Sequence, residues 1–209
     1  MGKTNKMAEA IALIDYGAGN LHSVANALKA AGAQDVAITA DPELVRGADR
    51  IVLPGVGAFG ACAAALRSVP GMIDALDQRV RRDGAPFLGI CVGMQLMANV
   101  GEEMGEHQGL GWISGRIRLL TPSDSTAKVP HMGWNDVRPT SPHPLIEAGE
   151  AYFLHSYAFE GDDVVATTDH AGSVVAAIAR DNMAGVQFHP EKSQRYGLEL
   201  LKRFLTWRP

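Results

Sequence analysis

The stretch FLGICVGMQLMAN, residues 87–99, constrains the fold of this chain more than any other. The residues up to Cys91 form a fully apolar run typical of a strand, and GMQLMAN has the pattern of a helix start. A strand that is apolar on both faces is buried on both faces, as in a parallel sheet covered by helices. The stretch therefore predicts a strand–turn–helix unit of an α/β fold, with Cys91 at the turn.

Short apolar runs and helical patterns alternate through the first half of the chain. Strands are predicted at residues 11–15, at 35–39 and from Arg50 onward, and helices at residues 20–32 and 70–84. After about residue 110 the segments are short, often alternating and broken by Gly, Pro and Asp, which favours antiparallel strands, and an amphipathic helix follows at 196–207. We expect a disordered lead over residues 1–9 and a single α/β domain over residues 10–209, with a mostly parallel central sheet flanked by helices.

Composition excludes several classes of function. The chain has 209 residues, is 46% hydrophobic and carries a net charge of −4, so it can bury a large core but offers no basic face for nucleic acid. We see neither a secretory signal nor an apolar run of the roughly 18 residues needed to cross a membrane. The two cysteines, Cys62 and Cys91, need not pair in a chain of this size. A cytoplasmic protein with reduced thiols is expected.

Cys91 is a candidate nucleophile. Gly89 and Gly93 flank it, which copies the G-x-S-x-G nucleophile elbow with Cys in place of Ser. A helix beginning near Val92 would place free N–H groups beside the sulfur and favour the thiolate. The alternative is a buried structural cysteine, which is common for this residue type. Cys62 lies in a small-residue helix, AFGACAAALR, and is interpreted as packing.

A nucleophilic thiol needs a base, and GVQFHPEKS supplies the best candidate. His189 follows a short apolar strand and would lie level with Cys91 if the two strands share a sheet. Glu191, two residues on, could accept a proton from one imidazole nitrogen and fix the tautomer. Taken alone, His-Pro-Glu would indicate only a turn. His155 is the second choice of base. Of the other histidines, His131, His143 and His170 lie near Pro or turn residues, and His22 and His107 resemble surface positions.

The loop GVGAFG, residues 55–60, formally matches the dinucleotide fingerprint G-x-G-x-x-G. That interpretation is disfavoured because the loop follows the third predicted strand and is preceded by Pro54. Two alternatives are a tight strand-to-helix loop, and a loop in which Gly55 and Gly57 let backbone N–H groups turn toward a developing oxyanion. The histidines lack the close spacing of zinc ligands, so no metal and no cofactor are expected.

Several motifs together resemble one family. GICVGMQLM with QFHPEKS is similar to the Cys–His–Glu core of the triad-type, or class I, glutamine amidotransferases, which implies a flavodoxin-like fold. More narrowly, DYGAGNLHSV, PGVGAFG, HMGWN and FHPEKSQ, in this order, resemble the glutaminase subunits of imidazole glycerol phosphate synthase. The resemblance implies hydrolysis of glutamine to glutamate and ammonia. Cys91 would form a thioester, His189 would transfer protons, and Glu191 would orient His189.

The resemblance also implies roles for other residues. The oxyanion hole would use the Val92 N–H and the Val56–Gly57 loop, which in this family can rest in an inactive orientation until a partner binds. The implied glutamine-binding residues are Gln95, Ser156 and Tyr157, and the implied partner-facing residues are Asn20, Trp134, Asn135 and Tyr152. For Trp134 and Tyr152 the alternative is core packing.

The implied partner is a (β/α)8 cyclase subunit that forms a heterodimer with this chain in histidine biosynthesis. It would receive ammonia through a tunnel and make imidazole glycerol phosphate and an aminoimidazole carboxamide ribotide. An alternative is the glutaminase of pyridoxal phosphate synthase, against which HMGWN and DYGAGN argue. The alternative outside enzymes is a thiol-sensing flavodoxin-like module, which would have no need of His189 and Glu191.

Overall fold

The structure is a computed structural model that describes residues 9–124 and 127–209. Its first half alternates strands and helices as predicted. The elements are β1 (Ala10–Ile14), α1 (Leu21–Ala30), β2 (Asp35–Thr39), α2 (Pro42–Gly47), β3 (Arg50–Leu53), α3 (Phe59–Ser68), α4 (Met72–Leu76), the π-helix η1 (Asp77–Arg82), β4 (Phe87–Ile90) and α5 (Val92–Gln95).

The second half is rich in strands and closes with a helix. Its elements are β5 (Val100–Gly101), β6 (His107–Gln108), β7 (Gly115–Leu119), β8 (His131–Pro139), β9 (Gly149–His155), β10 (Tyr157–Gly161), β11 (Val164–Asp169), β12 (Ser173–Arg180), β13 (Met183–Val186), the short 3-10 helix η2 (Pro190–Lys192) and α6 (Gln194–Thr206).

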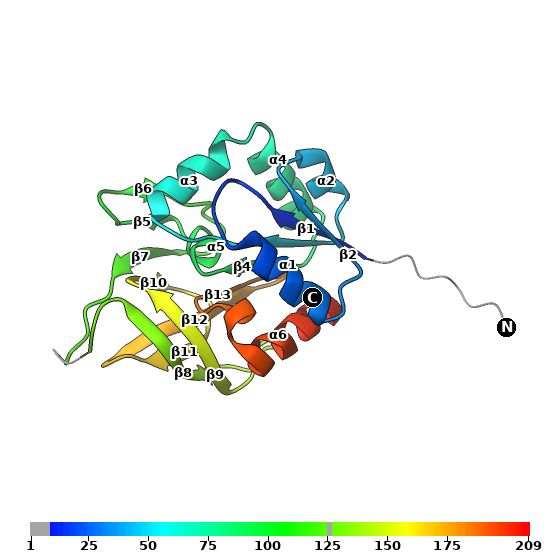
Figure 1. The fold of residues 1–209 in the computed structure, drawn as a ribbon. Coiled ribbons are helices and arrows are strands. Elements are labelled where there is room, and N and C mark those ends of the chain that lie inside the picture. Colours follow the sequence, from blue (N-terminus) through cyan, green and yellow to red (C-terminus); the bar gives the residue numbers. More distant parts are fainter. Residues whose placement is uncertain (1–8, 125–126) are drawn as a thin grey trace.

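Within the described ranges, the strands form one large sheet and one small sheet (Figure 1). The large sheet has the order β2-β1-β3-β4-β13-β12-β11-β8-β9, and its first five strands are parallel. The small sheet has the order β10-β7-β5-β6. The sequence predicted β13 as an antiparallel strand, which is confirmed for its pairing with β12 and wrong for its pairing with β4. A tight hairpin pairs it antiparallel with β12, while its other edge joins β4 in parallel.

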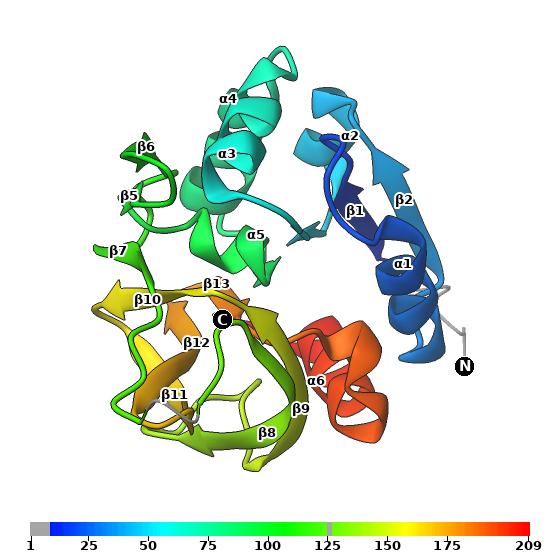
Figure 2. The same cartoon turned by 60° about the vertical axis from the view of Figure 1, so that its left-hand side comes forward.

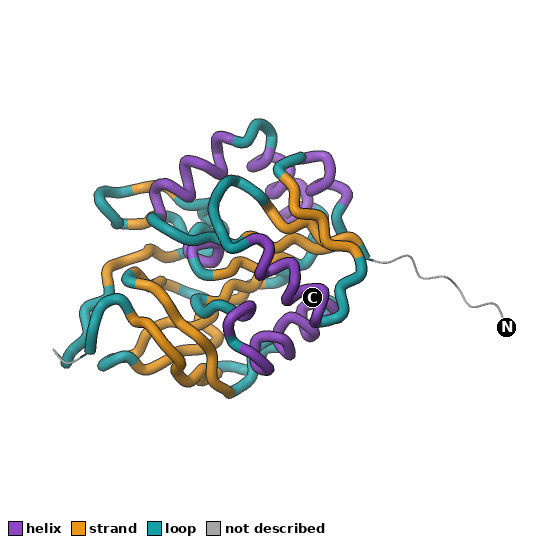
Figure 3. The backbone as a smooth tube through the Cα atoms, in the orientation of Figure 1, coloured by secondary structure: helices purple, strands orange, loops and turns teal. Residues whose placement is uncertain are grey.

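Helices cover both faces of the parallel strands. In Figure 1 and Figure 3, α1 and α6 lie together on one side, whereas α2, α3 and α4 lie on the other. Every residue of β3 and β4 is buried, as expected for the apolar residues 51–53 and 87–90 of a sheet covered on both faces, and Arg50 at the start of β3 is buried as well. Figure 2 shows strands β8 to β12 curling away from the parallel strands, beside α6.

Two predicted elements differ in length from the sequence-based expectation. The helix after Cys91 is only four residues long, because the carbonyls that follow it are used by the returning chain. The Leu96 carbonyl accepts from Leu110 N–H, and the Met97 carbonyl accepts from Trp112 N–H. The segment AYFLHSYAF, residues 151–159, is one of the predicted antiparallel strands, but it is divided at Ser156, so that β9 joins the large sheet and β10 joins the small one.

The predicted disordered lead lies, apart from Glu9, outside the described residues. The Glu9 carboxylate pairs with the buried guanidinium of Arg50 at 2.9 Å. Across residues 9–124 and 127–209, the helices are too short or too polar to span a bilayer.

Candidate active site

Cys91 stands on a sharp turn between β4 and α5. Its φ of 53° lies in the left-handed region, which is uncommon for a residue with a side chain. A Cβ atom added to Gly93 would lie 1.8 Å from the Leu53 carbonyl oxygen, and one added to Gly89 would lie 2.7 Å from the Gly93 oxygen. Both flanking glycines are therefore needed for the close packing of the turn, and the predicted strand–turn–helix unit with Cys91 at the turn is confirmed.

His189 reaches the same edge of the sheet because β13 runs parallel to β4. Val186, the last residue of β13, pairs with Ile90, so the residues that follow both strands meet. The imidazole of His189 is buried, and its Nδ1 lies 2.9 Å from Glu191 Oε1. The Glu191 carboxylate is itself buried on η2. This geometry assigns the Nδ1 proton of His189 to the bond with Glu191 and leaves Nε2 for the thiol.

The electrostatics of this trio favour a protonated His189. Burial alone disfavours the imidazolium, but hydrogen bonds and attraction to Cys91 and Glu191 outweigh it and raise the pKa of His189 to about 9. At neutral pH the imidazole is therefore protonated. A cation beside a thiol favours the thiolate, which is the nucleophilic form.

The loop after β3 closes over the elbow. The Val92 N–H, the predicted oxyanion donor, lies 3.4 Å from the Gly55 carbonyl oxygen and donates to it. That donor is therefore already used in this structure. Gly57 has a φ of 101°, a conformation that favours glycine, and both Val56 and Gly57 face the cavity beside Cys91.

Two buried side chains donate hydrogen bonds to backbone carbonyls at this loop. The Tyr16 hydroxyl donates to the Pro54 carbonyl at 2.7 Å, and the Cys62 thiol donates to the Val56 carbonyl at 3.4 Å. Burial raises the pKa of both Tyr16 and Cys62, so both remain protonated donors. Cys62 is buried as predicted, but its polar contact with the loop was not expected from a small-residue helix.

A cavity of about 300 Å³ opens in front of Cys91. It brings together the predicted catalytic, oxyanion and glutamine-binding residues Val56, Gly57, Cys91, Val92, Gln95, Ser156, Tyr157 and His189, with Glu191 behind His189. The cavity is also lined by residues for which sequence reasoning assigned no role, namely Glu103, Pro130, Leu154 and Lys192. Lys192 stands within the motif QFHPEKS without an assigned role, whereas Glu103, Pro130 and Leu154 stand outside the family motifs quoted above.

His155, the second choice of base, is engaged elsewhere. Its Nδ1 lies 3.0 Å from the Tyr157 carbonyl oxygen and its Nε2 lies 3.1 Å from His131 Nδ1. Burial lowers the pKa of His155 to about 3 and that of His131 to about 4. Both rings are therefore neutral at pH 7. Asn135 extends this series of hydrogen bonds, because its amide donates to His131 Nε2 at 3.0 Å.

The predicted partner-facing residues lie in different settings. Trp134 is 48% exposed and pairs across β8 and β9 with half-buried Tyr152, their ring centroids 6.2 Å apart. Core packing is thus excluded for Trp134. Asn135 is half-buried and points its amide at His131, whereas Asn20 is exposed just before α1.

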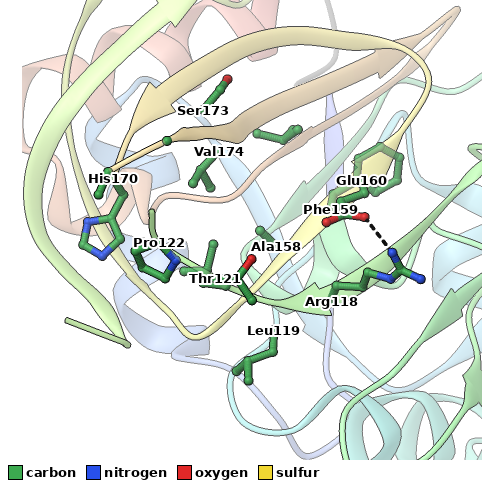
Figure 4. A pocket seen from close by; sticks show the side chains of 14 residues that line it. Arg118, Leu119, Thr121, Pro122, Ala158, Phe159, Glu160, His170, Ser173 and Val174 are labelled. Carbon is green, nitrogen blue, oxygen red and sulfur yellow. Dashed lines mark hydrogen bonds and ion pairs between the residues drawn. The ribbon is translucent and has the colours of Figure 1, made fainter. Parts of the chain in front are cut away.

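A second cavity, of about 200 Å³, lies between the small sheet and β12 (Figure 4). It is lined by the ion pair of Arg118 and Glu160, at 3.4 Å, and by Leu119, His170 and Val174 among others. It shares no lining residue with the cavity at Cys91. Among the residues that the structure describes, no group of three or more His, Cys, Asp or Glu is arranged to hold a metal ion.

Comparisons with known proteins agree with this geometry. The family model for glutamine amidotransferase class-I matches residues 12–207. The imidazole glycerol phosphate synthase subunit HisH of Zymomonas mobilis is 60% identical, over 98% of this chain and 99% of its own length. The subunit of the same name from Caulobacter vibrioides is 50% identical, over 96% of this chain and all of its own.

Among solved structures, a glutamine amidotransferase aligns with a TM-score of 0.68 at 19% identity, over 91% of this chain and 98% of its own. The structure of PurLQS from Thermotoga maritima aligns with a TM-score of 0.66 at 17% identity, over 96% of this chain and 99% of its own. At this identity the likeness concerns the fold alone. The family match and the two HisH relatives show that the chain belongs to the class I glutamine amidotransferases and, within them, to the HisH subunits of imidazole glycerol phosphate synthase.

Proposed function

We propose that the chain is the glutaminase subunit of an imidazole glycerol phosphate synthase and that Cys91, His189 and Glu191 perform its chemistry. The observation that carries the proposal is the buried triad: a thiol on a sharp elbow, an imidazole with a raised pKa, and a carboxylate 2.9 Å from its Nδ1. The cavity beside the triad is large enough for one amino acid.

The first half of the reaction makes a thioester. The Cys91 thiolate attacks the side-chain carbonyl carbon of glutamine, a C–S bond forms, and the carbonyl electrons move to oxygen. The His189 imidazolium then protonates the amide nitrogen as the C–N bond breaks and ammonia leaves. Glu191 holds the ring in the orientation that this transfer needs.

The second half consumes water. Neutral His189 takes a proton from a water molecule that attacks the thioester carbonyl. The resulting tetrahedral species collapses with cleavage of the C–S bond, releasing glutamate and restoring the Cys91 thiolate and the imidazolium. The net reaction is glutamine plus water to glutamate plus ammonia. The chemistry requires a free thiol at Cys91, which a reducing compartment such as the cytoplasm would preserve.

The oxyanion site needs a rearrangement before it can act. In this structure the Val92 N–H donates its hydrogen bond to the Gly55 carbonyl oxygen. Rotating the Gly55–Val56 peptide plane would free that donor and turn the Val56 N–H toward the same point, giving two donors for the oxyanion. Low activity of the isolated chain follows from this arrangement, with the partner favouring the rotated state.

The partner docks on the outer surface of β8 and β9 of this chain. Met132 is 66% exposed and pairs in register with Leu154, as Trp134 pairs with Tyr152. Leu154 also lines the catalytic cavity, so this apolar surface is continuous with the mouth of the site. A (β/α)8 cyclase subunit docked there, forming a heterodimer, would receive ammonia directly from the cavity.

Glutamate release from glutamine tests the proposal. The purified chain is assayed first alone, then with the nucleotide ligand and a cyclase subunit, next to the variants C91A and E191Q. We expect low release alone, a large rise with the liganded cyclase, none from C91A, and a kcat lower by roughly 10²- to 10⁴-fold in E191Q because the ring loses its orienting charge.

Two results would count against the proposal. Absence of release under all conditions by a folded chain would contradict the glutaminase assignment. An E191Q variant with unchanged turnover would contradict the role of Glu191. A chain that shows no turnover but keeps its Cys91 reactivity in E191Q would favour a thiol-sensing module, in which the carboxylate has no catalytic task.

A further inference from the structure

Gln187 is a fully buried polar side chain that the mechanism above does not use. It lies immediately after β13, and its N–H donates to the Ala176 carbonyl at 2.9 Å. Cys91 lies immediately after the neighbouring strand β4, and its N–H donates to the Val186 carbonyl at 2.8 Å. Gln187 and Cys91 are therefore neighbours at the edge of the sheet where the reaction takes place.

Gln187 belongs to a chain of hydrogen bonds that ends on the nucleophile. Gln95 Nε2 donates to both the Tyr157 carbonyl and Gln187 Oε1, each at 3.0 Å. Gln187 Nε2 in turn lies 3.7 Å from Cys91 Sγ and donates to it. The Tyr157 carbonyl oxygen determines which end of each amide donates in this series of hydrogen bonds. A reversed Gln95 amide would bring its own oxygen against that carbonyl oxygen.

This direction has two consequences. Both hydrogens of the Gln95 amide are used, so Gln95 can offer only its oxygen, an acceptor, to a molecule in the cavity that it lines. An acceptor suits the α-ammonium group of glutamine. The Gln187 N–H that faces the sulfur stabilises a thiolate more than a thiol, because hydrogen bonds to charged groups are the stronger ones.

We propose that Gln187 is a positioning residue of the glutaminase site, which donates a hydrogen bond to the Cys91 sulfur and orients the Gln95 amide toward the substrate. The part that concerns substrate rests on the function proposed above, whereas the contact with Cys91 does not. A buried amide is costly unless it is hydrogen-bonded, and both polar atoms of Gln187 are directed at side chains of the site.

Two variants of Gln187 separate positioning from packing. Q187M keeps the length of the side chain and removes both polar atoms, and Q187E replaces the donor beside the sulfur with a charged acceptor. Q78M, at a half-buried glutamine of η1 that bonds Asp83, is the matched control. The rate of alkylation of Cys91 by iodoacetamide is measured from pH 5 to pH 10 by mass spectrometry of the Cys91 peptide, with the melting temperature recorded for each variant.

The midpoint of the rate–pH profile should move upward by about one pH unit in Q187M, which corresponds to a loss of roughly tenfold in thiolate stabilisation. Q187E should move it further, since its carboxylate repels the thiolate. The KM for glutamine should rise about tenfold in Q187M because Gln95 is no longer oriented. Q78M should match the wild type in all three measurements.

An unchanged midpoint in a folded Q187M or Q187E overturns the proposal, and so does a loss of activity explained by a lowered melting temperature alone. If Q187M does not fold, the midpoint of the rate–pH profile of Q187E tests the proposal alone. A wild-type chain that releases no glutamate while the midpoint still shifts in Q187M would refute the proposed function and leave the contact of Gln187 with Cys91 standing.

Discussion

At the scale of single residues, the turn at Cys91 depends on the lack of a side chain at Gly89 and Gly93 as much as on the Cys91 thiol. Cys91 holds a left-handed backbone conformation that an isolated residue would avoid. The surrounding backbone imposes it, because Gly89 and Gly93 let β3, β4 and α5 approach more closely than any Cβ would allow. The reactive sulfur is thus positioned by packing of the main chain.

The first prediction concerns Gly93. Because its added Cβ would lie 1.8 Å from the Leu53 carbonyl oxygen, G93A must shift the backbone of β3 or α5. We expect the free energy of unfolding to fall by about 2 kcal/mol or more, measured by urea denaturation. G47A is the control, since nothing lies within 4 Å of a Cβ added at Gly47 in α2. Equal stability of G93A and G47A would contradict the close approach.

The sequence identifies site residues whose proposed role has a local chemical signature and misses those whose role depends on atoms distant in the chain, even where these residues stand in a quoted motif. Cys91, His189 and Glu191 could be found because each carries a local signature of glycine spacing or of a strand end followed by a carboxylate. Tyr16 and Gln187 could not. Their function depends on atoms more than 30 residues away, the Pro54 carbonyl and the Cys91 sulfur, and no local pattern marks such contacts.

At the scale of elements, the site is assembled by the parallel pairing of β4 with β13. Parallel strands place their carboxyl ends at one edge, which brings Cys91 and His189 together although about half of the chain separates them. The hairpin of β12 and β13 makes this possible, because it sends the chain back along the sheet in the direction of β4. The antiparallel segment thereby places His189 beside Cys91.

The second prediction concerns the outer face of β8 and β9. Trp134 is 48% exposed there beside Tyr152, so W134A should leave the fold and the triad intact. It should weaken binding of the cyclase subunit by about 2 kcal/mol, as for a central aromatic side chain of an interface, measured by titration calorimetry. L44A removes a similarly exposed apolar side chain from α2 and should not change the affinity. If W134A binds as tightly as the wild type, the docking face lies elsewhere.

At the scale of the whole molecule, stability depends on pH through two buried histidines. The folded chain lowers the pKa of His155 to about 3 and that of His131 to about 4, from an ordinary value of 6.5, mainly by burial. A histidine that is neutral when folded stabilises the protein above pH 6.5, and that contribution is lost as the pH falls toward 4 and below. The neighbouring rings of His170 and His189 act in the same direction on His155.

The third prediction is therefore an acid-induced loss of stability. Between pH 6.5 and pH 4 the free energy of unfolding should fall, with up to about 1.4 kcal/mol per pH unit from each of the two histidines. H131Q should show a shallower fall in urea denaturation over this range, whereas H22Q, at an exposed position, should follow the wild type. Parallel curves for H131Q and the wild type would contradict the assignment.

Local sequence was enough to predict the α/β alternation, the turn at Cys91 and the three residues proposed as the triad, because strand and helix periods, glycine turns and short motifs are local properties of a chain. The way these parts meet is visible only in the folded molecule: the parallel pairing of β13, the Gly55 carbonyl on the Val92 N–H, and the direction of Gln187 toward the sulfur. Each of these joins residues distant in sequence. Their geometry follows from the packing of the whole sheet, which no single segment encodes.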